Sequence, residues 1–405
     1  MRLVVTLAWR NLWRHTRRTL MILFAFALGV WSMVVIASIS RGSMEQSLDK
    51  SILNLTGHIQ LHAPGYRDDP AIEYRFAQPG ADLREALAGR DIIAWASRVR
   101  IPAVVASERE SAGVTLVGID PERERGLSFI PDAITEGRFL ESPDDPGVVL
   151  GRKLAERLET GIGKRVVLMS QDVNNRIGDR GFRVVGLFDT LPQQTEEAFV
   201  FIGRATAQQT LKMDETVNEI AVMTVSRDRP EGPLSRLRAA APDLEAEPWT
   251  AIEPLLTLTR EITDVILFIW YAIVFSAMSF GLINTLLMAV FERTREFGLF
   301  QALGMPPRHI LGQVLVESLI LLLLALLLGN LLAWATIASL MGGIDLSAVA
   351  EGMELMGIAP MIYPAWAPAD IIAANTLVFV LGLAASLYPA WRASRQVPVE
   401  AITRV

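Results

Sequence analysis

The residue types that most often perform chemistry in proteins are sparse in this sequence and fall into no catalytic pattern. The chain has no cysteine and four histidines, and it lacks both the G-x-S-x-G nucleophile motif and the H-E-x-x-H zinc motif. Gly161–Arg165, GIGKR, is only superficially similar to a phosphate loop, because Leu158 replaces the first glycine and no hydroxyl residue follows the lysine. We therefore interpret this segment as a turn and expect no catalytic residue on this chain.

His58 and His62 are residues of a metal-ligand type at short spacing. The segment HIQLH alternates polar and apolar residues, which places both imidazoles and Gln60 on one face of a strand. Two imidazoles can hold a metal ion, but no third ligand is evident in the sequence. An exposed strand whose polar face meets water explains the same residues, and we prefer this interpretation and expect no metal.

Residues 292–308 combine charged and apolar side chains at helical spacing. In Glu292–Met305, ERTREFGLFQALGM, one helix face carries Arg293 and Glu296, while Phe297, Phe300 and Leu303 can be buried against a partner. Such a helix suits the docking of a soluble protein. The alternative is an interfacial helix that lies on lipid.

Four charge-poor stretches indicate a membrane protein. The mean hydropathy is +0.34 and only 20% of residues are charged, whereas about 20 apolar helical residues suffice to span a bilayer. Two spans carry small-residue pairs, Ala25-x₃-Gly29 and Ala277-x₃-Gly281, which allow close helix approach. We place the spans at residues 19–41, 261–291, 309–341 and 370–391.

Glu317 is a charge within the third span and is costly to bury ionised. It must face protein, a cavity or the nearby interface. Pairing with Arg293, Arg295 or Arg308 is the structural interpretation, which we prefer over a role in gating.

The arginines predict the orientation. Residues 1–18, expected to form an amphipathic helix, carry five arginines and no acidic residue, whereas Gly42–Arg260 carries 34 acidic and 26 basic residues. Four spans then place both termini, the 292–308 loop and the tail 392–405 in the cytoplasm. Residues 42–260 and the short apolar loop 342–369 lie on the outer side of the membrane. A cleaved signal peptide is the alternative for the N-terminus, but no A-x-A site follows the long apolar run.

Residues 42–260 are expected to form an α+β domain held by helical stems. Met44, Leu48, Ile52 and Leu55 recur at helical spacing, so the first span should continue as a stem to about residue 54. A similar apolar face precedes the second span, and a boundary between two lobes is expected near 108–113. We predict strands at 58–62, 101–106, 114–119, 148–150, 166–169, 182–188, 198–202 and 219–225, and helices at 82–87, 152–159, 204–211 and 233–239.

Several separated segments resemble FtsX-like ABC transporter permeases, the family that includes the MacB exporter and the lipoprotein-releasing subunits LolC and LolE. Arg293–Gly304, RTREFGLFQALG, is similar to the family signature, and Tyr388–Ile402, YPAWRASRQVPVEAI, to its closing motif. Ala8–Thr19, AWRNLWRHTRRT, looks like its N-terminal helix. Segments that resemble the MacB-like periplasmic core are Gly137–Phe139, Val148–Leu158 and Phe182–Phe188.

The resemblance implies a type VII, mechanotransmission architecture with two permeases and two ATPase subunits in the bacterial inner membrane. Residues 42–260 and the loop 342–369 would then lie in the periplasm. The ATPase would bind ATP and Mg²⁺, this chain would hold no cofactor, and the second permease would be a copy of it or a paralogue. Only about eighteen residues precede the first span, so we expect the ATPase to be a separate chain. The net charge of −6 gives no reason to expect nucleic acid. By position, the coupling helix would contact the ATPase through Arg293, Glu296, Phe297, Leu299, Phe300 and Leu303.

Within the family, Thr56–Pro64, TGHIQLHAP, and Leu116–Pro121, LVGIDP, look closer to LolC and LolE. This favours extraction or release of lipoproteins or other amphipathic substrates, with a periplasmic carrier or adaptor as a further partner. The alternatives are MacB-like efflux of peptides, siderophores or toxins, and FtsX-like regulation of a periplasmic hydrolase. Chosen by depth alone, the candidate residues of a substrate cleft between the first two spans are Met33, Ile36, Ile266, Ile269 and Ile273.

Overall fold

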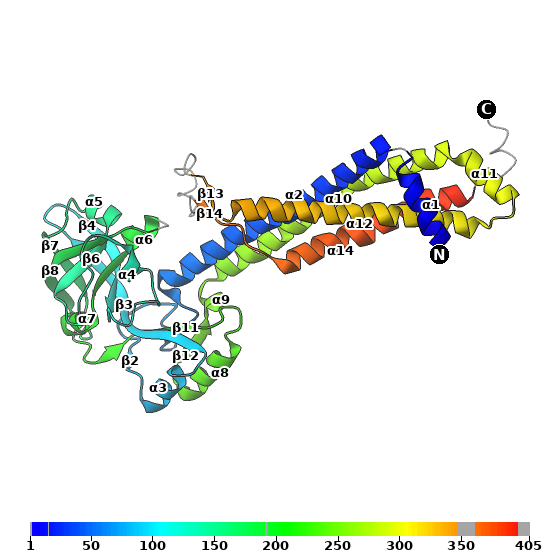
Figure 1. Cartoon of the computed structure of the whole chain (residues 1–405). Helices are drawn as coiled ribbons and strands as arrows, with labels where there is room; N and C mark the ends of the chain where they lie inside the picture. Colours follow the sequence, from blue (N-terminus) through cyan, green and yellow to red (C-terminus); the bar gives the residue numbers. More distant parts are fainter. Residues whose placement is uncertain (1, 15, 191–192, 347–360, 396–405) are drawn as a thin grey trace. The chain divides into compact units, whose positions relative to one another are not determined.

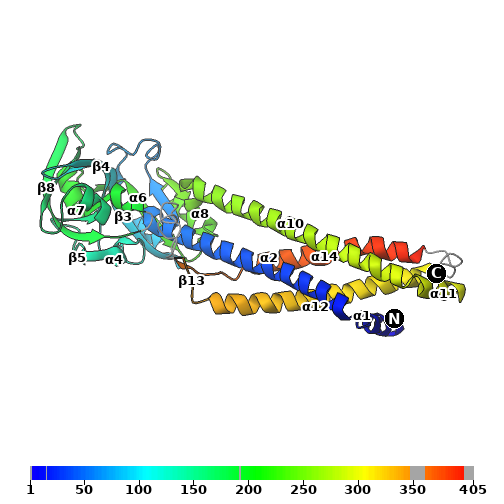
Figure 2. The same ribbon diagram turned by 90° about the horizontal axis from the view of Figure 1, so that it is seen from above.

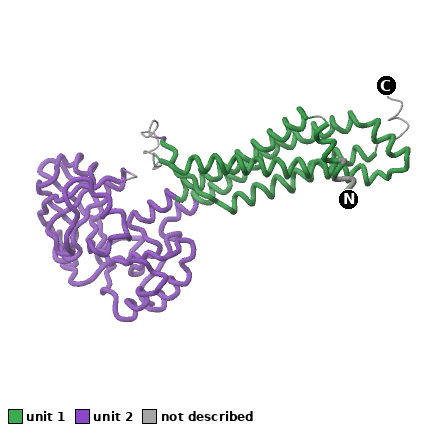
Figure 3. The backbone as a smooth tube through the Cα atoms, in the orientation of Figure 1, with its two compact units in different colours: residues 1–45, 259–345, 361–405 green, residues 46–258, 346–360 purple. Residues whose placement is uncertain are grey.

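The computed structural model describes residues 2–14, 16–190, 193–346 and 361–395. The chain forms two compact units (Figure 3), a helical unit from residues 1–45, 259–345 and 361–405 and an α+β unit from residues 46–258 and 346–360. Met353 and Met356 of the predicted external loop, and the tail from residue 396 onward, lie outside the described residues.

Four long helices build the helical unit, and they run side by side in both views (Figure 1, Figure 2). Each contains a stretch long enough and apolar enough to cross a membrane, in agreement with the four predicted spans. The long helices are α2 (Thr16–Ser51), α10 (Pro254–Glu292), α12 (Pro307–Leu340) and α14 (Pro368–Ser394). Shorter elements of this unit are α1 (Arg2–Leu12), α11 (Thr294–Ala302), β13 (Ile344–Asp345) and β14 (Met361–Ile362).

Small residues set the distance between the spanning helices. A Cβ atom on Gly29 of α2 would lie 2.1 Å from the sulfur of Met278 on α10. A Cβ on Gly329 of α12 would lie 2.6 Å from the Cβ of Val30 on α2. The helix backbones therefore approach more closely than larger side chains would allow, as van der Waals packing in a membrane favours.

Polar clamps add specific links to this packing. Arg41 of α2 donates to Asp370 of α14 at 2.6 and 3.0 Å and pairs with Asp264 of α10 at 2.6 Å. Deeper in the bundle, the amides of Asn330 and Asn375 hydrogen-bond to each other at 2.7 and 3.1 Å, which joins α12 to α14. Hydrogen bonds between apolar helices fix their register as well as their distance.

The α+β unit is built on one extended sheet with strand order β12-β1-β11-β3-β4-β9-β6-β8-β5, and β7 pairs with β3 and β8. Every strand and helix predicted within this unit is present, which confirms the α+β class. The strands are β1 (Ile59–His62), β3 (Ile92–Ala106), β4 (Ser111–Ile119), β5 (Ile134–Gly137), β6 (Gly147–Gly151), β7 (Arg165–Gln171), β8 (Ile177–Phe188), β9 (Phe199–Gly203), β11 (Glu219–Thr224) and β12 (Glu245–Pro248), with the short pair β2 (Phe76–Ala77) and β10 (Thr216–Val217). The helices are α3 (Ala81–Leu87), α4 (Ile130–Ala133), α5 (Arg152–Arg157), α6 (Gln193–Ala198), α7 (Arg204–Leu211), α8 (Glu231–Ala240) and α9 (Trp249–Ile252).

Strand β3 joins two lobes of this unit. Its residues 92–98 pair with β11, and its residues 99–106 pair with β4. Separate apolar cores flank the two halves, one including Ile220 and Leu237 and the other including Leu116 and Ile202. The boundary between the two lobes therefore lies within a single strand, at Arg98. It does not lie near residues 108–113, where the chain turns between β3 and β4.

Strand β1 is interior, so the prediction of an exposed strand is wrong. It lies between β11 and β12, and all four of its residues are buried. The polar side chains pair with each other in part, since His62 Nε2 lies 2.9 Å from Gln60 Oε1 and the Gln60 amide donates to the carbonyl of Thr56 at 2.8 Å, while His62 Nδ1 is buried and has no hydrogen-bond partner among the described residues. Burial lowers the pKa of His62. These contacts replace part of the water that the polar face was expected to meet.

The first stem ends where its helical geometry breaks. α2 passes at Ser51 into a π-helical turn, η1 (Ile52–Thr56), close to the predicted end at residue 54. Leu55 and Gly57 take positive φ angles of 74° and 67°, which turn the chain toward β1. The side chain of Leu55 is fully buried against Phe188 and Phe201 in the core of the second lobe.

A fully buried arginine fixes this stem end to both lobes. Arg98 donates to Glu124 at 2.7 and 2.8 Å, to Glu219 at 3.0 Å, and to the carbonyl of Leu55 at 2.5 Å. Both carboxylates are also buried. Although burial alone would raise it, the pKa of Glu219 is lowered by the charges of Arg100 and Arg98. The cluster therefore holds an ion pair in which every charge has a partner.

Replacing Arg98 with methionine should strongly destabilise the α+β unit. The change leaves Glu124 and Glu219 buried without their common partner, a loss that typically costs about 3–5 kcal/mol. The free energy of unfolding can be measured by urea-dependent hydrogen exchange of peptides from β3 and β11 in the full chain.

The matched control is Arg109→Met, which breaks an exposed pair with Glu159 whose side chains are 74% and 52% exposed. Exposed pairs contribute little, so this variant should exchange like the wild type. Equal exchange in both variants would contradict the structural role of the buried cluster.

Candidate functional site

The segment predicted as a coupling helix forms α11, a short helix between the second and third long helices (Figure 1). Gly304 follows it with a φ of 94°, a conformation that glycine adopts readily after a helix end. Pro306 and Pro307 then begin α12, where the missing amide hydrogen is tolerated. Two turn signals therefore delimit α11 from the following span.

One face of α11 is anchored inside the helical unit. Phe297 is fully buried, and the Arg293 guanidinium lies 4.9 Å from the centre of its ring. Phe300 is partly buried against the same apolar cluster. Phe297 is therefore a core residue and not a surface contact, which corrects its assignment as an ATPase contact. The buried members of the cluster are Val290, Phe297, Ile310, Val314, Ala390 and Ala393.

Glu296 is engaged within the chain. Arg14 donates to its carboxylate at 2.6 Å, and Arg293 donates to it at 3.3 Å. Partial burial opposes the charged form, but the hydrogen bonds and charges of these arginines lower the pKa of Glu296 overall. Glu296 thus ties α11 to the N-terminal segment, a partner that its place in the sequence did not suggest.

Glu317 is the centre of a second link. It is 8% exposed, and Arg293 donates to both of its carboxylate oxygens at 3.0 and 3.1 Å. The amide of Asn11 in α1 donates to the same group at 2.9 Å. Of the three arginines considered from the sequence, Arg293 is the one that the structure places on Glu317. The start of α11, α1 and α12 are thereby joined.

A third link connects the N-terminal segment to the end of the second long helix. Arg18 donates to both carboxylate oxygens of Glu292 at 2.6 and 2.7 Å, a bidentate geometry that fixes orientation as well as distance. The sequence analysis did not pair Arg14 or Arg18 with these glutamates. The surplus of arginine before the first span was the signal that could have suggested it.

The outer side of α11 is exposed among the residues that the structure describes. Leu299 and Leu303 are 53% and 78% exposed, and Arg295 and Ala302 are also exposed. Leu299, Ala302 and Leu303 follow Arg295 by four, seven and eight residues, so the four side chains lie on one side of the helix. We call Arg295, Leu299, Ala302 and Leu303 the outer face of α11. Exposed leucines on a helix whose other side is anchored are typical of a docking surface.

The candidate cleft residues differ in their exposure. Met33 is fully buried in the core of the helical bundle and cannot line an open cleft, which corrects its assignment. Ile266, Ile269 and Ile273 are 58%, 51% and 58% exposed and follow one side of α10 at helical spacing. Ile36 on α2 is 36% exposed. What remains is an exposed apolar face of α10.

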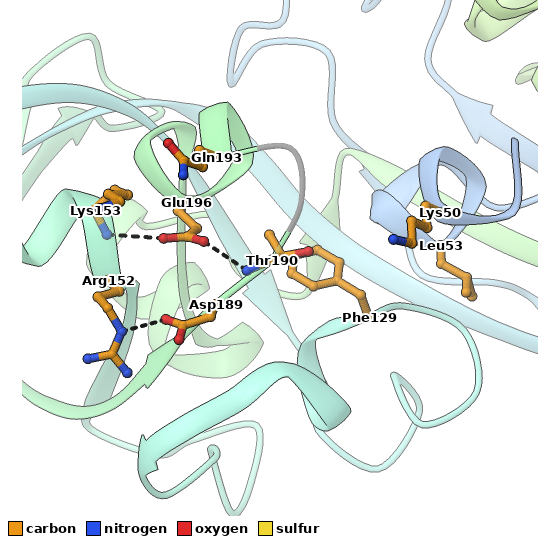
Figure 4. Close-up of a pocket in the computed structure, with 9 residues that line it drawn as sticks. All are labelled: Lys50, Leu53, Phe129, Arg152, Lys153, Asp189, Thr190, Gln193 and Glu196. Carbon is orange, nitrogen blue, oxygen red and sulfur yellow. Dashed lines mark hydrogen bonds and ion pairs between the residues drawn. The ribbon is translucent and has the colours of Figure 1, made fainter. Parts of the chain in front are cut away.

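A cavity of about 590 Å³ opens in the α+β unit beside the end of the first stem (Figure 4). Arg152 donates to Asp189 at 2.8 Å, and the carboxylate of Glu196 accepts two backbone amide hydrogens at 2.9 and 3.2 Å. These acidic groups are committed to internal pairs, so they do not form an acid–base pair poised for catalysis. The lining residues are Lys50, Leu53, Phe129, Arg152, Lys153, Asp189, Thr190, Gln193 and Glu196.

The two histidines considered for a metal are engaged in the α+β unit. His58 Nδ1 lies 3.0 Å from the hydroxyl of Thr224, and His62 contacts Gln60. Within the part of the chain that the structure describes, no group of three or more His, Cys, Asp or Glu side chains is placed to hold a metal ion.

The chain has four helices that are long and apolar enough to span a membrane, and an α+β unit is inserted between the first two of them in the sequence. A short anchored helix follows the second. This combination defines an α-helical membrane protein with one large inserted domain. Family models identify the family. The model for the MacB-like periplasmic core domain matches residues 19–240, and the model for the FtsX-like permease C-terminal region matches residues 267–398. The chain belongs to the FtsX-like, MacB-type family of ABC transporter permeases.

Relatives within the family differ in their named roles. The lipoprotein-releasing system transmembrane protein LolC of Neisseria meningitidis is 23% identical over 311 residues, covering 74% of this chain and 72% of the relative. An ABC transporter permease of Mycobacterium tuberculosis is 26% identical over 262 residues, covering 64% of this chain and 65% of the relative. The pyoverdine export ATP-binding/permease protein PvdT of Pseudomonas syringae is 24% identical over 98% of this chain and 58% of the relative. The chain thus spans less than two thirds of the last two relatives.

A solved structure of the periplasmic region of MacB from Actinobacillus actinomycetemcomitans is also similar. It is 16% identical, and the match covers 50% of this chain and 93% of that chain with a TM-score of 0.36.

Truncating Phe297 should loosen α11, whereas truncating Leu299 should not. Phe→Ala in a packed core costs about 3–5 kcal/mol, and the buried ring is the main apolar anchor of this helix. Phe297→Ala should raise amide exchange of peptides from residues 294–305 at least tenfold. Leu299→Ala, on the outer face, should stay within twofold of the wild type in the same measurement. Similar exchange in the two variants would show that Phe297 does not anchor α11.

Proposed function

We propose that this chain is the permease subunit of a type VII ABC transporter in the bacterial inner membrane. In this arrangement both termini and α11 lie in the cytoplasm, and the α+β unit lies in the periplasm. The five arginines of residues 2–18, with no acidic residue among them, support this orientation. Family membership implies a cytoplasmic ATPase partner, which would bind the ATP and Mg²⁺, and this chain would be non-catalytic.

The observation that carries this proposal is the two-sided construction of α11. Its inner side is fixed by Phe297 and by the pairing of Arg293 with Glu317, while Leu299 and Leu303 on its outer face are exposed. An ATPase groove that receives the outer face would gain the burial of both leucines, about 1.5–3 kcal/mol for each side chain fully buried. Displacement of α11 by the ATPase would then reach α12 through the Arg293–Glu317 pair.

The substrate we propose is a lipoprotein or another amphipathic molecule, which the likeness to LolC supports. Removing an acyl chain from a bilayer forfeits about 0.8 kcal/mol for each CH₂ group that meets water, so the process needs both energy and an apolar surface. The exposed residues Ile266, Ile269 and Ile273 of α10, with Ile36, offer such a surface. A second permease, identical or paralogous, and a periplasmic carrier would complete the path.

Export of a siderophore-like molecule through a periplasmic adaptor is the second candidate. The specific observation in its favour is the alignment with the pyoverdine export protein PvdT, which spans 98% of this chain.

Charging the outer face of α11 should uncouple the ATPase. Leu299→Asp with Leu303→Asp places two charges where an apolar contact is proposed, and should lower permease-stimulated ATP hydrolysis at least tenfold without unfolding α11. Hydrolysis and co-purification are measured with the ATPase that purifies with the wild-type chain.

The control is Ile177→Asp in β8, a residue that is 79% exposed and therefore comparable to Leu303 at 78%. It should leave stimulation unchanged. Full stimulation of ATP hydrolysis by the double variant would show that the outer face of α11 does not contact the ATPase.

Release of an acylated protein tests the proposed substrate. The purified assembly is reconstituted in liposomes that contain a triacylated reporter protein, and ATP-dependent transfer of the reporter to a soluble carrier is measured. Transfer should require hydrolysable ATP, and a reporter without acyl chains should not compete with it. Transport of a siderophore in the same liposomes, with no movement of the acylated reporter, would favour the second candidate and reject the first.

A further inference from the structure

A lateral groove lies between α2 and α10, and its lining on α10 begins at Ala277, one helical turn after the exposed Ile273. It has a volume of about 410 Å³, within the range of about 300–1,000 Å³ that is common for ligand pockets. Both helices contribute to its walls. The lining residues are Arg18, Met21, Ile22, Ala25, Phe26, Ala277, Met278, Gly281, Asn284, Thr285 and Met288.

Small residues create this groove. Ala25 lies on the α2 side, and Ala277 and Gly281 lie on the α10 side. A Cβ atom on Gly281 would meet nothing within 4 Å, in contrast to Gly29, whose Cβ would lie 2.1 Å from the sulfur of Met278. The two glycines of the predicted small-residue pairs therefore serve different purposes. Gly29 brings the helices together, and Gly281 leaves space open.

The groove opens to the lateral surface of the bundle. Met21 and Met288 at its rim are 66% and 54% exposed, and Ala277 and Gly281 are exposed as well. Most of the groove lies within the apolar stretches of α2 and α10. Its surroundings are therefore hydrocarbon, and an apolar chain is the occupant that such walls favour.

One end of the groove is polar. Arg18 lines it while it pairs with Glu292, and Arg17 beside it is exposed and has no ion-pair partner among the described residues. Asn284 also lines the groove, and its amide has no hydrogen-bond partner within the described part of the chain. An amide within a spanning helix normally faces a partner because hydrocarbon offers none. The groove thus contains an unsatisfied amide, and the uncompensated positive charge of Arg17 lies one helical turn before the rim residue Met21.

We propose that this groove binds a membrane phospholipid with an anionic headgroup. The headgroup lies at Arg17 and Arg18, the ester region reaches Asn284, and an acyl chain follows Ala25 and Gly281. The eight residues from Arg18 to Ala25 span about 10 Å of helix, about a third of a 30 Å hydrocarbon core, which suits the upper part of an acyl chain below its headgroup.

This lipid is distinct from the proposed substrate because the two would present their polar ends at opposite ends of the helices. The polar end of the groove adjoins the Arg18–Glu292 end, whereas the exposed isoleucines begin at Ile266, nearer the start of α10, although Ile273 is only one helical turn from Ala277 in the groove. Assignment of the groove to the cytoplasmic leaflet rests on the orientation given under the proposed function. Lipid binding itself does not depend on that orientation. It also requires neither ATP nor the ATPase.

Filling the groove tests the proposal. The full chain is purified in nanodiscs of mixed phosphatidylglycerol and phosphatidylcholine, and retained lipids are counted by native mass spectrometry. Gly281→Leu should lower the retained phospholipid at least tenfold, because the new side chain occupies the groove without a backbone clash. Ala25→Leu, from the opposite wall, should have the same effect and guards against a folding defect specific to the glycine.

The matched control is Gly312→Leu on α12, where a Cβ atom also meets nothing within 4 Å. It should retain lipid like the wild type. Arg17→Gln should keep the bound acyl chain but lower the preference for phosphatidylglycerol over phosphatidylcholine at least threefold.

Two outcomes would overturn the proposal. The first is equal lipid retention in Gly281→Leu, Gly312→Leu and the wild type. The second is efficient disulfide crosslinking of Ala277→Cys between two copies of the chain, because a second copy would then occupy the groove. Since retention is measured without the ATPase or a transported substrate, its failure would leave the proposed transport function unaffected, and loss of transport would leave the lipid site intact.

Discussion

Charges that leave water must find partners, and this constraint determines how distant segments of the chain meet. In the α+β unit, Arg98 joins Glu124, Glu219 and the carbonyl at the end of the first stem. In the helical unit, Glu317 is paired with Arg293 and reached by Asn11. An unpaired charge at either position would cost several kcal/mol, roughly the order of a whole domain's net stability. Within each unit, segments that are far apart in the sequence are therefore held together by a few obligatory contacts.

Local requirements made most of the fold predictable. A segment that crosses lipid must satisfy its own backbone, so the four long helices could be recognised from hydropathy alone. Strands of the α+β unit were recognisable from short β-rich runs. The failure at His58–His62 had a non-local cause, since β11 and β12, which bury this strand, are more than 150 residues away in the sequence. The same applies to the lobes, whose junction lies inside β3 because pairing partners change along one continuous strand.

The candidate site shows a similar division. Helical periodicity predicted α11 and its two faces, but it could not say which face the rest of the chain would cover. Phe297 was assigned outward and is buried because residues of α10, α12 and α14 converge on it. Glu296 was predicted to contact the ATPase, and its pairing with Arg14 was not predicted because Arg14 is 282 residues away in the sequence. Leu299 and Leu303 remain exposed since no part of the described chain reaches them.

The helical unit therefore has two kinds of surface: buried contacts that hold the helices in fixed positions, and exposed apolar faces that can bind different partners in turn. Buried ion pairs and close glycine contacts, such as Gly29 against Met278, resist relative sliding because any shift exposes a charge or forces a clash. Exposed apolar faces carry no such penalty and can be covered by lipid, by a second protein or by a transported chain in turn. A force on Leu299 and Leu303 would meet a helix whose opposite side is anchored by Phe297 and Arg293. It would move α11 together with α12, since bending α11 away would first have to break those contacts.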